Sequence, residues 1–262
     1  MSRKKRRIGI RLFVLLVLLG APVGIVYRDW KQAKRDNALL DAIEAGNNRK
    51  ALEALAEGAN GEARYGVAPT FREALRNLLG HMREPGKKDE EEHPSALILL
   101  YMDTWDLKKY GSGPPLALVR ALLDHGARVD DRGVLERSPL FYASLFPNRE
   151  AVGLLLEHGA DIEAKDIDGR TPLMVANHSE ETSVLLEHGA CMDAVDKEHK
   201  TPLIWAASYS KLDVVSFLLK HGAKVGAKDV YGKTAIDYAR DNAESYPASR
   251  KVIALLRQYG AK

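Results

Sequence analysis

Cysteine is nearly absent from the 262-residue chain, and Cys191 is its single example. One cysteine excludes an intramolecular disulfide, a zinc site built from several thiolates and a redox-active cysteine pair. A phosphate-binding glycine loop, a nucleophile elbow and the His-Glu-x-x-His helix of metalloproteases are missing as well. An enzyme would need a polar cluster built by residues 61–114, and no feature there indicates one. The sequence therefore predicts no enzyme, no cofactor, no metal site and no small-molecule substrate.

Acidic residues are scarce at the N-terminus, which explains the net charge of +3. Residues 1–35 contain ten Lys or Arg against Asp29 alone, a charge of +9, whereas residues 36–262 contain 29 basic and 35 acidic residues, a charge of −6. The chain is thus a cationic leader joined to a mildly acidic body. We expect no nucleic-acid partner, because the body lacks the surplus of basic residues that nucleic acids attract.

The leader contains a long hydrophobic run, residues 8–27, in which Arg11 is the only charge. A helix of about 20 residues spans about 30 Å, the thickness of the hydrocarbon core of a bilayer. The sequence therefore predicts a basic cytoplasmic tail (1–7), a transmembrane signal-anchor (8–27), a juxtamembrane linker (28–35) and a folded body (36–262). Because the more basic flank of a span stays cytoplasmic, the body is expected in a periplasm or an equivalent exoplasmic space.

A cleaved signal peptide is the alternative interpretation of the leader, since a basic start and a short apolar core fit one equally well. Cleavage after Ala21 would place Leu19 at a position that requires a small residue, and cleavage after Gly24 would place Pro22 there. The anchor is therefore favoured. The cleaved form would be a secreted or periplasmic effector, or a protective partner of an exported enzyme.

The body repeats itself at intervals of 33, 30 and 33 residues, measured between glycines. These glycines belong to a recurring Leu-Leu-x-His-Gly-Ala phrase and are Gly126, Gly159, Gly189 and Gly222. A Ser/Thr-Pro-Leu phrase begins at Ser138, Thr171 and Thr201, with a weaker version at Thr234. A hydroxyl followed by proline favours a helix start, and a left-handed glycine favours a helix end. Each unit thus predicts two short helices, and such units must stack to bury their apolar faces.

The body resembles an ankyrin-repeat array over residues 115–262, where these phrases stay in register. The segments 166–173 (Asp-Ile-Asp-Gly-Arg-Thr-Pro-Leu) and 229–234 match the loop tip and first helix of that family. The resemblance implies an all-α solenoid of antiparallel helix pairs with projecting β-hairpin loops. It also implies that the protein binds another protein, as an adaptor or scaffold.

The repeats depart from the family pattern in ways that affect the fold. The 171–200 unit lacks three residues between its helices, and Glu136 and His199 replace the usual tip glycine, so we expect distorted tips at those two positions. Residues 39–60 have the pattern of a degenerate first repeat. The irregular segment 61–114 predicts one expanded repeat or two irregular ones, with helices at 70–79 and 95–105, followed by a helix at 115–124.

Candidate metal sites in the repeats have simpler explanations. Histidines that recur once per repeat, His125, His158, His188 and His221, lie about 8–10 Å apart in stacked helices, too far to share an ion bound at about 2.0–2.1 Å. We expect each ring to meet the last free carbonyls of its helix. The Asp166-x-Asp168-Gly169 phrase lacks two ligands of a calcium loop and predicts a turn. Cys191 is expected to be a structural or half-exposed thiol.

The resemblance implies a concave binding surface formed by the loop tips and the exposed ends of the first helices. The positions that it transfers to this chain are Val134, Leu135, Arg137, Leu145, Phe146, Ile167, Asp168, Arg170, His178, Ser179, Lys197, Glu198, Lys200, Ser208, Tyr209, Val230, Tyr231 and Lys233. Apolar and aromatic residues on a free surface gain nothing for folding, so their presence indicates a contact patch. The alternative is that half of them pack under adjacent tips. Trp205 and Tyr142 are expected in the core.

Overall fold

The structure is a computed structural model that describes residues 23–63, 95–103, 113–244 and 246–261. Its regular elements in these ranges are helices: α2 (Val23–Glu44), α3 (Asn48–Ala56), α5 (Ala96–Asp103), α6 (Leu116–Asp124), the 3-10 turn η1 (Val134–Glu136), α7 (Pro139–Ala143), α8 (Arg149–Glu157), α9 (Pro172–Val175), α10 (Ser179–Glu187), α11 (Pro202–Ser208), α12 (Leu212–Lys220), α13 (Ala235–Asp241) and α14 (Pro247–Gln258).

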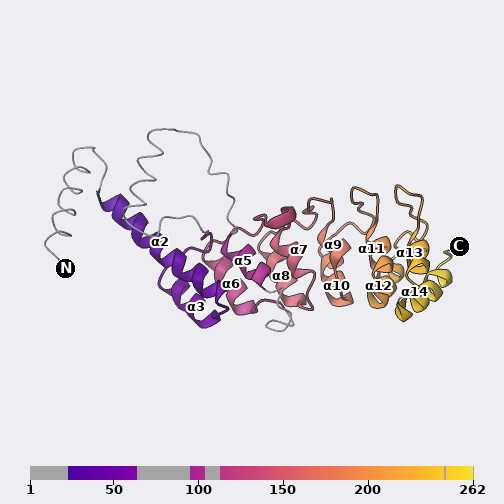
Figure 1. Cartoon of the computed structure of the whole chain (residues 1–262), viewed down its shortest axis with the longest axis horizontal. Helices are drawn as coiled ribbons and strands as arrows, with labels where there is room; N and C mark the ends of the chain where they lie inside the picture. Colours follow the sequence, from indigo (N-terminus) through magenta and orange to yellow (C-terminus); the bar gives the residue numbers. More distant parts are fainter. Residues whose placement is uncertain (1–22, 64–94, 104–112, 245, 262) are drawn as a thin grey trace.

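The helices stack as pairs in two parallel rows, as predicted (Figure 1). The inner row, α2, α5, α7, α9, α11 and α13, packs each helix against the next, and so does the outer row, α3, α6, α8, α10, α12 and α14. The loops between pairs rise beside the inner row. This arrangement is an elongated solenoid in which each pair contacts its neighbours.

Local sequence fixes where the helices begin and end. Before α7, Ser138 Oγ accepts a hydrogen bond from the amide of Phe141 at 3.2 Å, and Thr201 does the same for Ile204 before α11 at 3.3 Å. After α8, Gly159 has a φ of 84°, a left-handed conformation that penalises other residues. The four helix-ending histidines each place Nδ1 2.8 Å from the carbonyl oxygen four residues earlier. This confirms their expected role; a carbonyl only accepts, so the proton is on Nδ1.

Helices α5 and α6 form one pair between the first unit and α7–α8. Helix α2 contacts α5 directly and α3 contacts α6. Whether 61–114 forms one expanded repeat or two irregular ones stays a prediction, because residues 64–94 and 104–112 lie outside the described residues. The helix expected at 70–79 lies outside the described residues, whereas those expected at 95–105 and 115–124 correspond to α5 and α6.

Most of the predicted membrane span, 8–27, lies outside the described residues. Residues 23–27 open α2, which has 22 residues and continues through the expected linker, 28–35, to Glu44. Among the helices of the described ranges, none is both long and apolar enough to cross a membrane. The anchor is therefore still a prediction from sequence.

The projecting loops are turns, so the expectation of β-hairpins is wrong for the described residues, in which no strand is found. Two backbone hydrogen bonds close each loop, as from the amide of Asp166 to the carbonyl of Arg170 at 3.0 Å and from the amide of Gly169 to the carbonyl of Asp166 at 2.9 Å. Further bonds join successive loops, as from the amide of Ile167 to the carbonyl of Leu135 at 2.9 Å. Sequence periodicity predicts the loops but not these bonds, which depend on how the repeats stack.

Two loop tips without glycine adopt left-handed backbone. His199 has a φ of 61°, close to the 81° of Gly169 at the equivalent tip, so this tip is not distorted. In the first loop both Leu135 and Glu136 are left-handed, with φ of 61° and 60°, and they lie in η1. The expected distortion is therefore present at Glu136 and absent at His199.

Polar residues interrupt the apolar core at α10. One apolar cluster extends from Leu39 to Ala190 and a second from Leu203 to Leu256, and Leu186 packs against both. At the interior position where α8 has Ala151 and α12 has Val214, α10 has Glu181, which is 1% exposed. Burial raises the pKa of Glu181, and a hydrogen bond from the backbone and the nearby His178 lower that pKa in part. The core therefore divides between α10 and α11.

Candidate partner-binding surface

A pocket of about 230 Å³ opens on the inner face between α7, α9 and α11. We call it the α9 pocket; its walls include Arg137, Phe141, Leu145, Met174, Trp205 and Tyr209. Helix α9 has 4 residues, against 5 in α7 and 7 in α11, and the 171–200 unit is three residues short between its helices. The pocket therefore lies where the missing turn of α9 would extend.

Asn177 holds the early end of α9 in place. After Val175 the chain leaves the helix at Ala176, whose φ and ψ are −54° and 125°. The Asn177 amide then donates to the carbonyl of Ser144 at 3.2 Å, and its side-chain Nδ2 donates to the carbonyl of Leu145 at 2.7 Å. These bonds tie the truncated end to the preceding repeat, so the pocket has a fixed floor.

Trp205 and Tyr209 form the aromatic wall of the pocket. Trp205 lies in the middle of α11 and Tyr209 directly follows its last residue, with ring centroids 5.7 Å apart and planes 12° from parallel. Trp205 Nε1 donates to Asp196 Oδ2 at 2.8 Å, which fixes the indole orientation. Tyr209 is 64% exposed. An ordered, exposed aromatic pair is typical of interaction surfaces.

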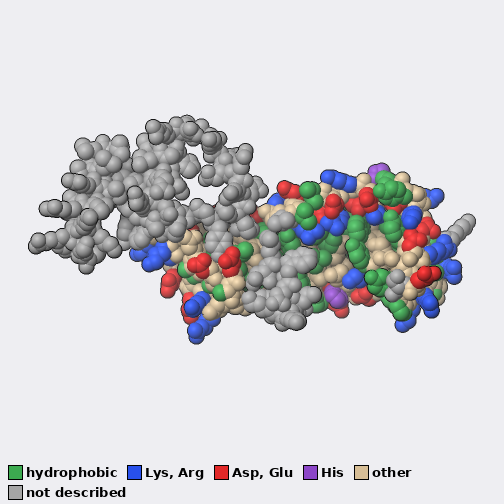
Figure 2. Space-filling view, in the orientation of Figure 1, with side chains coloured by type: hydrophobic (Ala, Val, Ile, Leu, Met, Phe, Trp, Pro, Cys, Tyr) green, Lys and Arg blue, Asp and Glu red, His purple; other side chains and the backbone are tan. Residues whose placement is uncertain are grey.

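Cations lie over the aromatic rings across successive repeats. The Arg137 guanidinium lies 5.1 Å from the ring centroid of Phe141, and Arg170 lies 5.6 Å from that of Trp205. Lys200 Nζ lies 5.2 Å from the ring centroid of Trp205 and 5.1 Å from that of Tyr238 in the next repeat. Figure 2 shows basic and hydrophobic side chains intermingled on the face in view over the repeats. Cation–π contacts of this kind hold long basic side chains against the surface.

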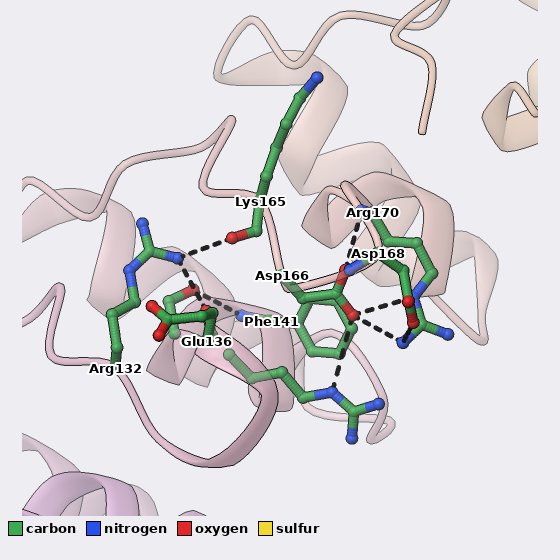
Figure 3. A network of polar contacts seen from close by, with 9 residues as sticks. Arg132, Glu136, Phe141, Lys165, Asp166, Asp168 and Arg170 are labelled. Atoms are coloured by element: carbon green, nitrogen blue, oxygen red, sulfur yellow. Dashed lines mark hydrogen bonds and ion pairs between the residues drawn. The ribbon is translucent and has the colours of Figure 1, made fainter. Parts of the chain in front are cut away.

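Asp166 is the buried centre of the charge network beside the pocket (Figure 3). Its Oδ2 accepts from Arg170 Nε at 2.9 Å and from Arg170 Nη2 at 2.6 Å, and Asp168 lies 2.9 Å from the same guanidinium. Burial disfavours the charge of Arg170, but these carboxylates outweigh it and raise its pKa above the usual value. Arg137 approaches Asp166 only to 3.8 Å. The charge of Arg170 is thus balanced by two carboxylates. Arg137, in contrast, has only a longer contact to the Asp166 carboxylate, which is already bonded to Arg170.

Comparison with family models identifies the repeats. A model of ankyrin repeats in three copies matches residues 163–229 and 195–262, and a single ankyrin-repeat model matches residues 136–167. The chain contains ankyrin repeats. A comparison with proteins of curated function finds no significant match. Ankyrin repeats generally serve as modules for binding other proteins, which suggests a protein–protein interaction role for this chain.

The exposed tips of the ankyrin loops carry many of the predicted contact residues. The apolar and aromatic ones exposed at the tips are Leu135, Ile167, Val230 and Tyr231, and Tyr209 is exposed at the C-terminal end of α11. The charged ones at the tips are Asp168, Lys197, Glu198 and Lys233, of which Glu198 is half-buried, while Arg137, Arg170 and Lys200 are half-buried against the aromatic rings. These residues share one side of the array. Val134 lies in η1, and its side chain is outside the part of the chain that the structure describes.

Other predicted contact residues are buried or make contacts within the protein. Phe146 is 8% exposed and covers Gly113, so its prediction as a surface anchor is wrong. Leu145 is half-buried in the wall of the pocket. His178 precedes α10, and its carbonyl accepts from the Thr182 hydroxyl. The Ser179 amide donates to Asp213, and Ser208 Oγ donates to the carbonyl of Trp205.

The structure adds residues that the sequence analysis missed. Trp205 was expected in the core, but it is only half-buried and lines the pocket; that prediction is wrong, whereas Tyr142 is buried as expected. Met174 and Lys211 also line the pocket. The three-residue shortening was the available signal, since a shorter helix exposes its neighbours. In the described part of the chain no cluster of three or more His, Cys, Asp or Glu forms a metal site, and Cys191 is exposed.

Proposed function

We propose that this chain is a protein-binding adaptor or scaffold that receives its partner on the inner face of its ankyrin repeats. The observation that carries the proposal is the exposure of Tyr209 and Tyr231, 64% and 69%, on the same face as the α9 pocket. Large aromatic side chains on a free surface gain nothing for folding, and tyrosine is enriched among the residues that dominate binding energy. A partner that covers them would gain from their burial.

The charged rim of this face supports binding to a specific partner. Loop-tip residues Asp168, Glu198 and Lys233 are already held in ion pairs with Arg170, Lys200 and Asp241. Exposed pairs of this kind contribute little to stability, at most about 1 kcal/mol. Their fixed positions instead supply a pattern that can align a partner and reject others.

The same proposal places the array at a membrane through residues 8–27, with the repeats on the periplasmic or exoplasmic side. The apolar run and the basic cluster before it support this location. Mass measurement of the native N-terminus tests it: an intact end with carbonate-resistant membrane association is expected. A shortened N-terminus would favour the secreted form, an effector or a protective partner of an exported enzyme.

Affinity capture with the full chain tests the binding face. Tyr209→Asp and Tyr231→Asp each place a charge where the partner would be desolvated, so both should abolish capture of a specific partner. Tyr246→Asp is the matched control, because Tyr246 is also exposed, 59%, but lies before α14. A partner captured equally by all three variants would show that binding uses another face.

A further inference from the structure

The α9 pocket lies beside the early end of α9, the 4-residue helix of the shortened unit. We propose that it seats one large apolar side chain of an extended, acidic segment of a partner protein. This inference rests on the protein-binding function proposed above and names the chemistry of the partner.

The size of the pocket favours a single side chain. Its volume of about 230 Å³ is below the range of roughly 300–1,000 Å³ in which drug-sized ligands are usually bound. A pocket of that size fits an anchor residue of a protein segment, and such anchors typically dominate the affinity of an interface. The walls suit an apolar anchor, because Phe141, Leu145, Met174 and the Trp205–Tyr209 pair all face it.

The floor of the pocket is preformed. Asn177 is bonded to the carbonyls of Ser144 and Leu145, and the indole of Trp205 is bonded to Asp196. A ligand therefore meets walls that are already ordered, which removes part of the entropy loss on binding. Tyr209 lines the outer edge of the pocket and is exposed to solvent, so an extended chain can pass over this edge.

The charge of the lining favours an acidic segment. The lining contains Arg137, Arg170 and Lys211 and, among the described residues, no Asp or Glu. Arg170 is neutralised by Asp166 and Asp168.

Arg137 has the 3.8 Å contact to Asp166 and shares that carboxylate with Arg170; it also contacts Phe141 and Tyr142, which carry no formal charge. Lys211 is half-buried, and no ion pair of its ammonium is found within the described ranges. Two cations at the rim thus lack a full counter-charge, and a carboxylate beside the anchor would supply it.

A random dodecapeptide library displayed on phage and selected against the full chain tests the proposal. The selected peptides should carry Trp, Phe or Leu within about two positions of Asp or Glu. For a synthetic copy of one such peptide, Lys211→Glu should weaken binding about tenfold in fluorescence anisotropy. Val175→Phe, which fills the pocket from α9, should weaken it similarly. Added salt should reduce the affinity of the original chain more than that of Lys211→Glu.

Matched controls separate the outcomes. Lys211→Arg keeps the charge and should retain binding, and Lys228→Glu reverses an exposed charge elsewhere and should have no effect. Unchanged thermal unfolding of each variant shows that the fold is retained. Basic or purely polar peptides, peptides insensitive to both pocket variants, or no selected peptide would overturn this inference. If partner capture still depends on Tyr231, the proposed protein-binding function holds even when this inference is overturned. If capture does not depend on Tyr231, the proposed function itself is overturned, independently of the pocket.

Discussion

Three aspartates at the same position of successive loops allow a graded test of the network that supports the binding face. The Oδ1 atoms of Asp166, Asp196 and Asp229 each accept the amides two and four residues later, at 2.8–3.0 Å. Their Oδ2 atoms have different partners: the guanidinium of Arg170, the indole N–H of Trp205 at 2.8 Å, and the hydroxyl of Tyr238 at 2.6 Å. Replacement by asparagine keeps the first atom and changes only the second.

The expected losses of unfolding free energy differ because the partners differ. Asp166→Asn turns an NH2 group toward a charged donor; removing one partner of a buried ion pair costs about 3–5 kcal/mol, and Asp168, still 2.9 Å from the guanidinium, favours the lower end. Asp196→Asn opposes an indole donor and loses a bond to a charged acceptor, about 1.5–3 kcal/mol. Asp229→Asn faces a hydroxyl that can reverse and accept, so about 1 kcal/mol is expected.

Urea unfolding of the full chain at neutral pH, followed by circular dichroism, measures this order. Asp168→Asn is the control: its carboxylate is 61% exposed, so its ion pair should contribute under about 1 kcal/mol. Equal losses for the three buried aspartates, or the largest loss at Asp229, would refute the reasoning that the second oxygen and its partner set the cost.

Three further changes test other parts of the fold. Glu181→Gln should stabilise the protein at pH 7 but not at pH 4. Burial raises the pKa of Glu181 in the folded state, so wild-type stability is greatest below the unfolded pKa and falls as pH rises through the folded pKa. An equal difference in unfolding free energy between variant and wild type at both pH values would contradict this. His199→Gly should stabilise by about 1 kcal/mol in urea unfolding, because it relieves a left-handed non-glycine residue with φ of 61°; destabilisation would mean that the side chain has an essential contact. His188→Ala should lower stability by about 0.5–1.5 kcal/mol through loss of its 2.8 Å bond to the Val184 carbonyl, and an unchanged urea midpoint would argue against that bond.

The features that could be predicted from sequence are local ones. The starts of α7 and α11 and the glycine after α8 follow from a few neighbouring residues, because a cap or a left-handed turn needs no distant partner. The same reasoning explained the helix-ending histidines.

The errors concern residues whose surroundings come from another repeat. Phe146 turns back over Gly113, which belongs to the irregular part of the chain. Trp205 follows the family pattern for an interior residue, yet it lines a pocket because α9, one repeat earlier, is short. The shortening was visible in the spacing of the glycines, but its effect depends on how three stacked helices meet, and periodicity alone does not contain that information.

The division of the apolar core between α10 and α11 determines where the array should yield under tension. Force applied along a solenoid passes through its interfaces in series, so the interface with the least apolar packing separates first. We expect that interface beside Glu181, where one apolar cluster ends and the next begins and where Leu186 packs against both. A partner segment in the α9 pocket would contact α7 and α9 on one side of this interface and α11 on the other, and would therefore stabilise the interface against separation.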